Sequence, residues 1–67
     1  MEIDINILIE LLKDCRVQQD CKYELKDKNT VLISGIIYEP HLYHILKVVK
    51  KNKFHIFMIS SGLMIYK

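Results

Sequence analysis

The chain has 67 residues, of which 51% are hydrophobic, and ten basic residues against eight acidic ones give a formal net charge of +2. This length fits one small α+β domain covering residues 1–67. The small net charge gives no reason to expect a polyanionic partner, and no apolar run approaches the roughly 20 residues of a membrane helix. Without a recognisable signal peptide, we expect a cytoplasmic protein with reduced cysteines and no membrane contact.

Alanine and tryptophan are both absent, whereas isoleucine and lysine are abundant. Alanine is the best helix former, so an AT-rich gene explains its absence better than a structural need does. Such genes occur in many bacteria, archaea, viruses and mobile elements. The composition therefore favours a small accessory or inhibitor protein, with a virus or mobile element as one source.

The first segment carries the signals of both a strand and a helix. Residues 2–10 alternate between polar and apolar, which is the period of a half-buried strand. Apolar residues also recur there at the spacing of one helix face, and Asp4 is suited to cap a helix. We predict a helix from Ile5 to Gln19, with a short strand at residues 2–5 as the alternative.

A charged strand is predicted at Lys22–Leu25, followed by a turn at residues 26–29 and the strongest strand of the chain at Thr30–Tyr38. Gly35 inside this strand indicates a bulge or a close approach by another backbone. Apolar side chains occupy both faces of the strand, so both faces need a cover. Helices can cover only one face of a two-layer domain, and the other face therefore predicts a second copy or another protein.

A second helix is predicted from Pro40 to Asn52, because proline suits the first turn of a helix. Its apolar face contains Leu42, Ile45, Leu46 and Val49. A hairpin should follow, with strands at residues 54–59 and 63–66 around a Ser-Ser-Gly turn.

The expected order is thus helix, strand, strand, helix, strand, strand. It predicts an α+β two-layer sandwich, in which two helices cover one face of a four-stranded, mostly antiparallel sheet. The expected strand order is 3-4-2-1. Moving the last strand to the front would give the ferredoxin-like arrangement, so a circularly permuted form of that sandwich is one solution.

In this order the strand at residues 54–59 lies at an edge of the sheet. Natural edge strands usually carry charge or proline, and residues 55–59 carry neither. An apolar edge with unpaired backbone groups is a template for strand addition. We therefore expect a homodimeric protein-interaction module whose partner binds Phe54, Ile56, Phe57, Met58 and Ile59.

The alternative is a small nucleic-acid-binding protein that uses the basic end of the second helix. Lysines could contact phosphates there while an aromatic ring stacks on a base. The residues concerned are Tyr43, Lys47, Lys50, Lys51 and Lys53. Arg16 is the only arginine, which argues against sequence-specific recognition.

Neither a metal nor a cofactor is expected. Four side chains could bind zinc, but the cysteines lack the close pairing that structural zinc sites show; these residues are Cys15, Cys21, His41 and His44. Ser60 and Ser61 are explained by the turn, and His55 by strand packing. The chain is therefore not expected to be an enzyme.

Overall fold

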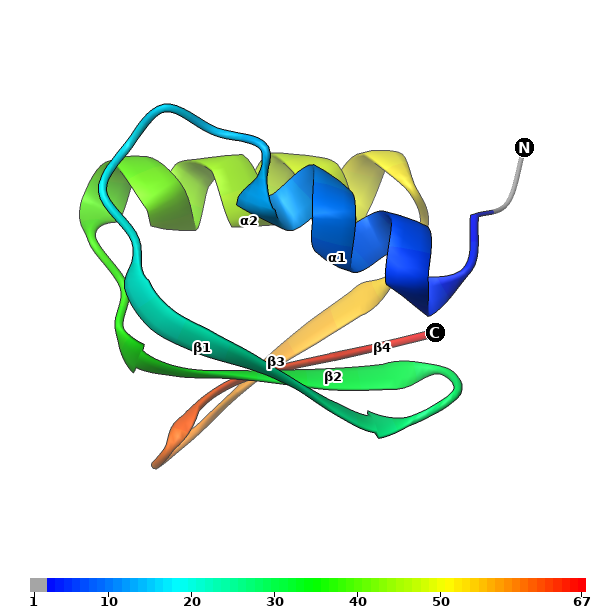
Figure 1. The fold of residues 1–67 in the computed structure, drawn as a ribbon. Coiled ribbons are helices and arrows are strands. Elements are labelled where there is room, and N and C mark those ends of the chain that lie inside the picture. The colour runs from blue at the N-terminus through cyan, green and yellow to red at the C-terminus, as the bar shows by residue number, and fades with distance from the viewer. Residues whose placement is uncertain (1–2) are drawn as a thin grey trace.

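The computed structural model describes residues 3–67, which form the predicted α+β sandwich (Figure 1). The elements in chain order are α1 (Ile5–Lys13), β1 (Asp20–Asp27), β2 (Thr30–Ile36), α2 (Glu39–Lys51), β3 (His55–Ile59) and β4 (Gly62–Tyr66). The alternative strand at residues 2–5 falls partly outside the described residues. Within them, Ile3 and Asp4 precede the helix without forming a strand.

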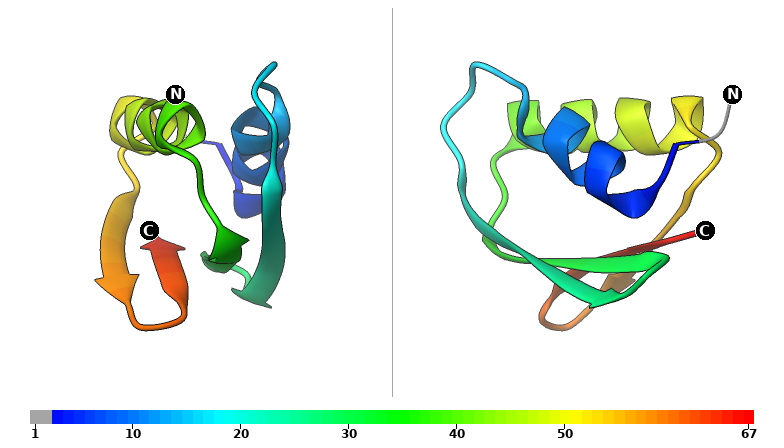
Figure 2. Two further views of the ribbon diagram at one scale, coloured as in Figure 1. Left: turned by 90° about the vertical axis from the view of Figure 1, so that its left-hand side faces the viewer. Right: turned by 45° about the vertical axis from the view of Figure 1, so that its right-hand side comes forward.

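The four strands form one antiparallel sheet in the order β1-β2-β4-β3, which confirms the predicted strand order. Both helices lie on the same face, with α1 over the β1 side and α2 over the β3 and β4 side (Figure 2). The charged strand β1 and the apolar strand β3 are therefore the two edges. The relation to the ferredoxin-like arrangement stays a prediction.

Helix α1 begins as predicted but ends at Lys13 rather than at Gln19. At its start, the Asp4 carboxylate accepts a hydrogen bond from the Ile7 amide at 2.9 Å. At its end, side chains from other elements bond the last carbonyls: His44 Nε2 lies 2.8 Å from the Leu11 oxygen. Cys15, which falls inside the predicted helix, consequently lies in the connection to β1.

Helix α2 presents to the core a face that overlaps the predicted one only in part, since Ile45 and Val49 belong to both. His41, Ile45 and Val49 are its buried residues, at a spacing of four. Leu42 is only half-buried, and Leu46 is 41% exposed. The helix is therefore rotated so that part of its apolar surface lies outside the core, beside β3.

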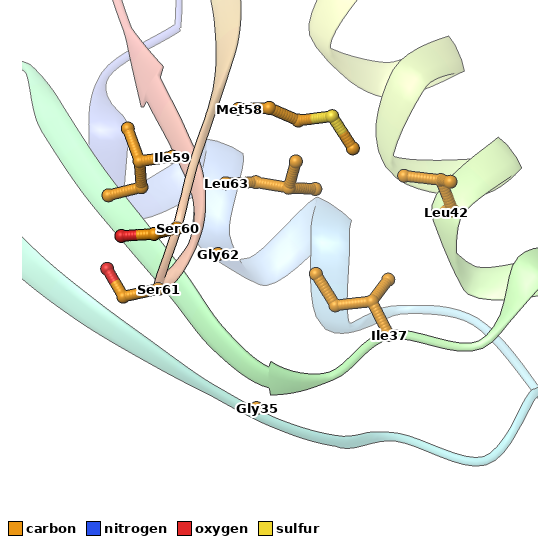
Figure 3. Close-up of a pocket in the computed structure, with 9 residues that line it drawn as sticks. All are labelled: Gly35, Ile37, Leu42, Met58, Ile59, Ser60, Ser61, Gly62 and Leu63. Carbon is orange, nitrogen blue, oxygen red and sulfur yellow. The ribbon is translucent and has the colours of Figure 1, made fainter.

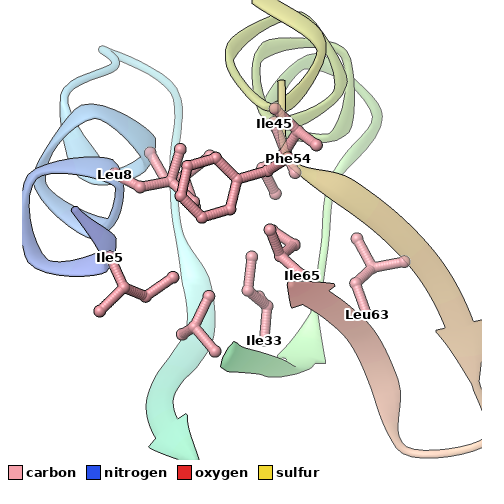
Figure 4. Close-up of a cluster of buried hydrophobic side chains, with 10 residues drawn as sticks. Ile5, Leu8, Ile33, Ile45, Phe54, Leu63 and Ile65 are labelled. Carbon is pink, nitrogen blue, oxygen red and sulfur yellow. The ribbon is translucent and has the colours of Figure 1, made fainter. Parts of the chain in front are cut away.

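The core lies between the helices and the sheet (Figure 4). It contains Ile5, Leu8, Leu12, Val31, Ile33, Ile45, Val49, Phe54, Leu63 and Ile65. Gly35 has a φ of +102°, and a Cβ atom there would lie 2.8 Å from the Asp20 carbonyl oxygen. The expected close approach of another backbone is thus confirmed, with β1 as the neighbour.

Candidate interaction surface

Strand β3 is an edge strand with large apolar side chains exposed along it. Phe57 is 55% exposed and Met58 75% exposed, while Ile56 and Ile59 are half-buried. Phe54 differs from these four residues because it is 6% exposed and belongs to the core. Its side chain is therefore not part of the surface for which the sequence suggested it.

The backbone of β3 leaves two residues facing the free edge. In an antiparallel pair, successive residues turn their N–H and C=O groups alternately to one side and the other. Just beyond the ends of β2 and β4, the Lys67 amide donates to the Asn29 carbonyl. Continuing this register along the pair, odd-numbered residues of β4 turn their backbone N–H and C=O groups to β2, and even-numbered residues turn theirs to β3. Phe57 pairs with Met64 and therefore faces β4. Ile56 and Met58 accordingly turn their backbone groups to the free edge.

The sheet face opposite the helices carries an apolar area that we call the outer patch: Thr30, Leu32, Phe57, Met64 and Tyr66. Leu32 pairs with Met64, and Met64 pairs with Phe57, so the three form a row across β2, β4 and β3. Four of the five residues line a shallow open hollow, while Leu32 is almost covered by its neighbours at 8% exposure. The row ends at charged Glu24 on β1.

On the opposite face of β3, a second apolar depression lies against α2. We call it the α2–β3 groove; it is lined by Leu42, Leu46, Ile56, Phe57, Met58 and Leu63. Figure 3 shows an adjoining pocket near the β3–β4 turn, in which Met58 points toward Leu42 and Leu63. Phe57 and Met58 thus connect apolar surfaces on both faces of the edge strand.

The basic residues of α2 are all exposed. Tyr43, Lys47 and Lys51 follow a helical spacing that places them on the solvent side, Lys50 is exposed between this row and Leu46, and Lys53 follows the helix. The Tyr43 hydroxyl donates to Glu39 at 3.1 Å. Among residues 3–67, only Lys26 and Glu24 form an ion pair within 4.0 Å. The lysines of α2 therefore have no carboxylate partner within the described part of the chain.

The possible zinc ligands lie in a polar cluster at the end of α1, but they contact different partners there. Fully buried His41 lies 3.7 Å from the Cys21 sulfur and 2.8 Å from the Tyr23 hydroxyl. Cys15 instead accepts from the Gln19 amide at 3.2 Å. No group of three or more His, Cys, Asp or Glu residues suited to a metal occurs in the described part of the chain.

Hydrogen bonds from this cluster satisfy carbonyl groups in the last turn of helix α1. The Tyr23 hydroxyl lies 3.4 Å from the Leu12 carbonyl oxygen, and the Gln19 amide donates to the Lys13 carbonyl at 2.9 Å. Burial raises the pKa of the Cys21 thiol, which keeps the sulfur protonated and weakly nucleophilic. The cluster thus has a structural role that accounts for its buried histidine.

The side chains considered for catalysis are far apart along the hairpin. His55 begins β3 and its ring lies 5.3 Å from the ring of Tyr66, whereas Ser60 and Ser61 form the turn at the other end of β3. The structure therefore does not bring the histidine and the serines together.

Sequence reasoning did not identify the β2 and β4 residues of the outer patch as part of the surface. Alternation placed side chains on a face of each strand, but only the cross-strand register shows that Leu32, Met64 and Phe57 share a row. It also assigned Leu42 and Leu46 to the core.

Comparison with protein-family models, with curated proteins and with solved structures gives no match to this chain. Among residues 3–67, neither helix has the length and apolar character required to cross a membrane. The function is therefore inferred from the surface alone.

Proposed function

We propose that this protein is a non-enzymatic protein-interaction module that binds through β3 and the outer patch. The observation that carries the proposal is the character of the edge. Residues 55–59 include no charge and no proline, and the most exposed apolar residues among them are Phe57 and Met58. Edge strands of monomeric proteins are normally protected against such pairing.

The other edge provides an internal comparison. Strand β1 carries Lys22, Glu24, Lys26 and Asp27 among its exposed residues, as a protected edge does. Charged side chains thus protect the β1 edge against strand pairing, whereas the β3 edge is apolar. Strand addition at β3 would use the outward backbone groups of Ile56 and Met58 for affinity and the side chains on both faces for specificity.

The first test compares variants at the two edges. The tagged protein is isolated from the cells that make it, and bound proteins are identified with and without high salt. Phe57→Ser should lose the bound protein, whereas Leu25→Ser, which removes a similarly exposed apolar residue from β1, should retain it. Circular dichroism checks that both variants fold. Equal binding by the two variants would contradict the proposal.

Nucleic-acid binding is the second candidate, because the exposed lysines of α2 have no carboxylate partner among the described residues. Contacts to phosphate weaken steeply as salt rises, whereas apolar contacts do not. The double variant Lys50→Glu, Lys51→Glu should abolish binding of labelled oligonucleotides if this candidate is right. If that variant loses binding to the native target while Phe57→Ser retains it, nucleic acid replaces protein as the partner.

We further propose that the module acts in the cytoplasm as an accessory protein of a virus or mobile element. The support is compositional for the source, and the two cysteines are unpaired with each other, as expected for a reducing compartment.

A further inference from the structure

The β3 edge and the adjoining side of α2 are complementary to themselves. We propose that β3 pairs antiparallel with β3 of a second copy about a two-fold axis through Phe57, which joins two four-stranded sheets into one. This inference deepens the proposed function, on which it rests, by naming the first occupant of the edge.

The backbone fixes the register of such a pair. Ile56 and Met58 turn their N–H and C=O groups outward, so hydrogen-bonded positions must pair these residues with each other. Centring the axis on Phe57 pairs Ile56 with Met58 of the other copy, and Met58 with Ile56, so that all outward groups of both residues are used. The five residues of β3 then overlap over their whole length.

The side chains also match in this register. Phe57 lies opposite Phe57 of the second copy at a non-hydrogen-bonded position, where cross-strand side chains are closest and aromatic pairs are favourable. The two outer patches become continuous across the joined strands. On the other face, the α2–β3 grooves of the two copies meet, which covers the exposed parts of Met58 and Leu46. No like charges oppose each other along β3.

The helices would meet at an ordinary packing distance. Two helices cover four strands in each copy, so each helix spans the width of two strands, or about 10 Å. Extending the sheet by one strand spacing places α2 of the second copy about 10 Å from α2, within the range of packed helices. Helix α2 thus occupies the position that a continuous second layer requires.

Charge along α2 is arranged for the antiparallel partner. Leu42 and Leu46 line the α2–β3 groove, and exposed Glu39 and Lys50 precede and follow them at steps of three or four, which places them beside the groove side of the helix. The two-fold axis runs the second helix in the opposite direction, which sets Leu42 against Leu46 and Glu39 against Lys50 of the other copy. An acidic residue at one end and a basic residue at the other therefore complement a second copy of this chain.

The inference predicts a particle of about twice the 8.0 kDa mass by light scattering, because the edge pairs with itself. Met58→Pro removes an outward N–H group without touching the β3–β4 pairing, and should weaken dimerisation roughly tenfold or more. Met58→Lys, which retains the N–H group, serves as a second variant in case the proline disturbs folding. Leu25→Lys on β1 is the matched control and should leave the dimer intact.

Cross-linking tests the register. In a protein carrying Cys15→Ser and Cys21→Ala, the added substitution Phe57→Cys should form an intermolecular disulfide on mild oxidation, because paired Cα atoms at such positions lie about 4.5 Å apart. Met58→Cys should cross-link poorly, since Met58 faces Ile56 of the other copy. Leu25→Cys on the opposite edge should not cross-link.

Charge exchange tests the helix contact. Glu39→Lys and Lys50→Glu should each weaken the dimer roughly three- to tenfold, since each breaks two symmetric pairs. The double variant should restore it, whereas Lys47→Glu on the solvent side should have no effect. Failure of the double variant to restore the dimer would overturn the α2 contact.

The remaining outcomes separate this inference from the proposed function. A strictly monomeric protein that still binds another protein through Phe57 overturns the self-pairing and leaves the proposed function standing. A dimer that is insensitive to Met58→Pro and does not cross-link at residue 57 also overturns the self-pairing. If the wild-type protein binds nucleic acid but neither itself nor any other protein, both the self-pairing and the proposed function are overturned.

Discussion

Lys53 has a backbone conformation that L-amino acids rarely adopt, with a φ of +61°. It follows the C-cap Asn52, and its amide bonds the Lys50 carbonyl at 3.2 Å while the Phe54 amide bonds the Val49 carbonyl at 3.0 Å. These two bonds form a Schellman motif, whose left-handed position glycine usually occupies. The motif turns the chain from α2 into β3 and directs Phe54 into the core.

Replacing Lys53 with glycine should therefore stabilise the protein by about 0.5–1 kcal/mol. Glycine relieves the steric cost of a Cβ atom at this φ, and the relief exceeds its larger loss of chain entropy. Urea denaturation of the variant and the wild type measures the difference. Lys51→Gly, at the last residue of α2, is the control and should destabilise the protein by a similar amount, because glycine is unfavourable in a helix. A destabilised Lys53→Gly variant would contradict this account of the helix end.

At the scale of the elements, α1 depends on its neighbours for its length. Its nine residues are too few for an independently stable helix in water. The end is held by His44 from α2 and by Gln19 and Tyr23 from the following segment, which bond the carbonyls of Leu11, Lys13 and Leu12. Packing and capping therefore decide where the helix stops.

Tyr23→Phe should destabilise the protein by about 1–3 kcal/mol at neutral pH, because the half-buried hydroxyl has polar neighbours in Leu12, Gln19 and His41. Denaturant melts measure the loss. Tyr43→Phe is the matched control, since the Tyr43 hydroxyl is on the exposed side of α2 and bonds only Glu39 among the contacts described. A cost for Tyr23→Phe no larger than the control's would show that the cluster does not hold α1.

The same hydroxyl predicts an alkaline limit to stability. Burial, followed by the nearby Cys21, raises the pKa of Tyr23 above its ordinary value of 10.0. The unfolded chain releases the proton at a lower pH than the folded chain, so the contribution is complete below pH 10.0 and is lost as pH rises above it. Melts at increasing alkaline pH should show a shallower decline for Tyr23→Phe than for the wild type. Parallel declines would contradict the assignment.

Much of the element order was predictable because local signals agree with the fold. Asp4, Pro40 and the Ser60–Ser61 turn mark starts and turns through local chemistry, and the structure confirms each of them. The end of α1 was predicted wrongly because two of the side chains that bond its last carbonyls, Tyr23 and His44, come from later elements that the local pattern does not contain. The rotation of α2 was missed for a similar reason: buried His41 has partners on β1, which the helix pattern does not contain.

The candidate surface was predictable in part. The free edge followed from the strand order and the lack of charge at residues 55–59, whereas the burial of Phe54 depends on the turn made by Lys53. A left-handed lysine has no sequence signature comparable to that of glycine. The outer patch depends on cross-strand register, which alternation within single strands does not specify.

At the scale of the whole molecule, a domain of this size has a thin margin of stability, and association would add to it. The thermal midpoint of the wild type should therefore rise with protein concentration. Met58→Pro should remove most of that dependence, while Leu25→Lys should preserve it. A midpoint that is independent of concentration would contradict self-association.

The strand order also has a consequence for the chain during synthesis. The central pair of the sheet joins β2 to β4, the last strand of the fold. Until residues 62–66 have been made, β2 has an open side with Val31, Leu32 and Ile33 and without a charged residue from Thr30 to Ile36. Such a segment can pair with other nascent chains. A polypeptide interrupted before β4 should thus aggregate through β2.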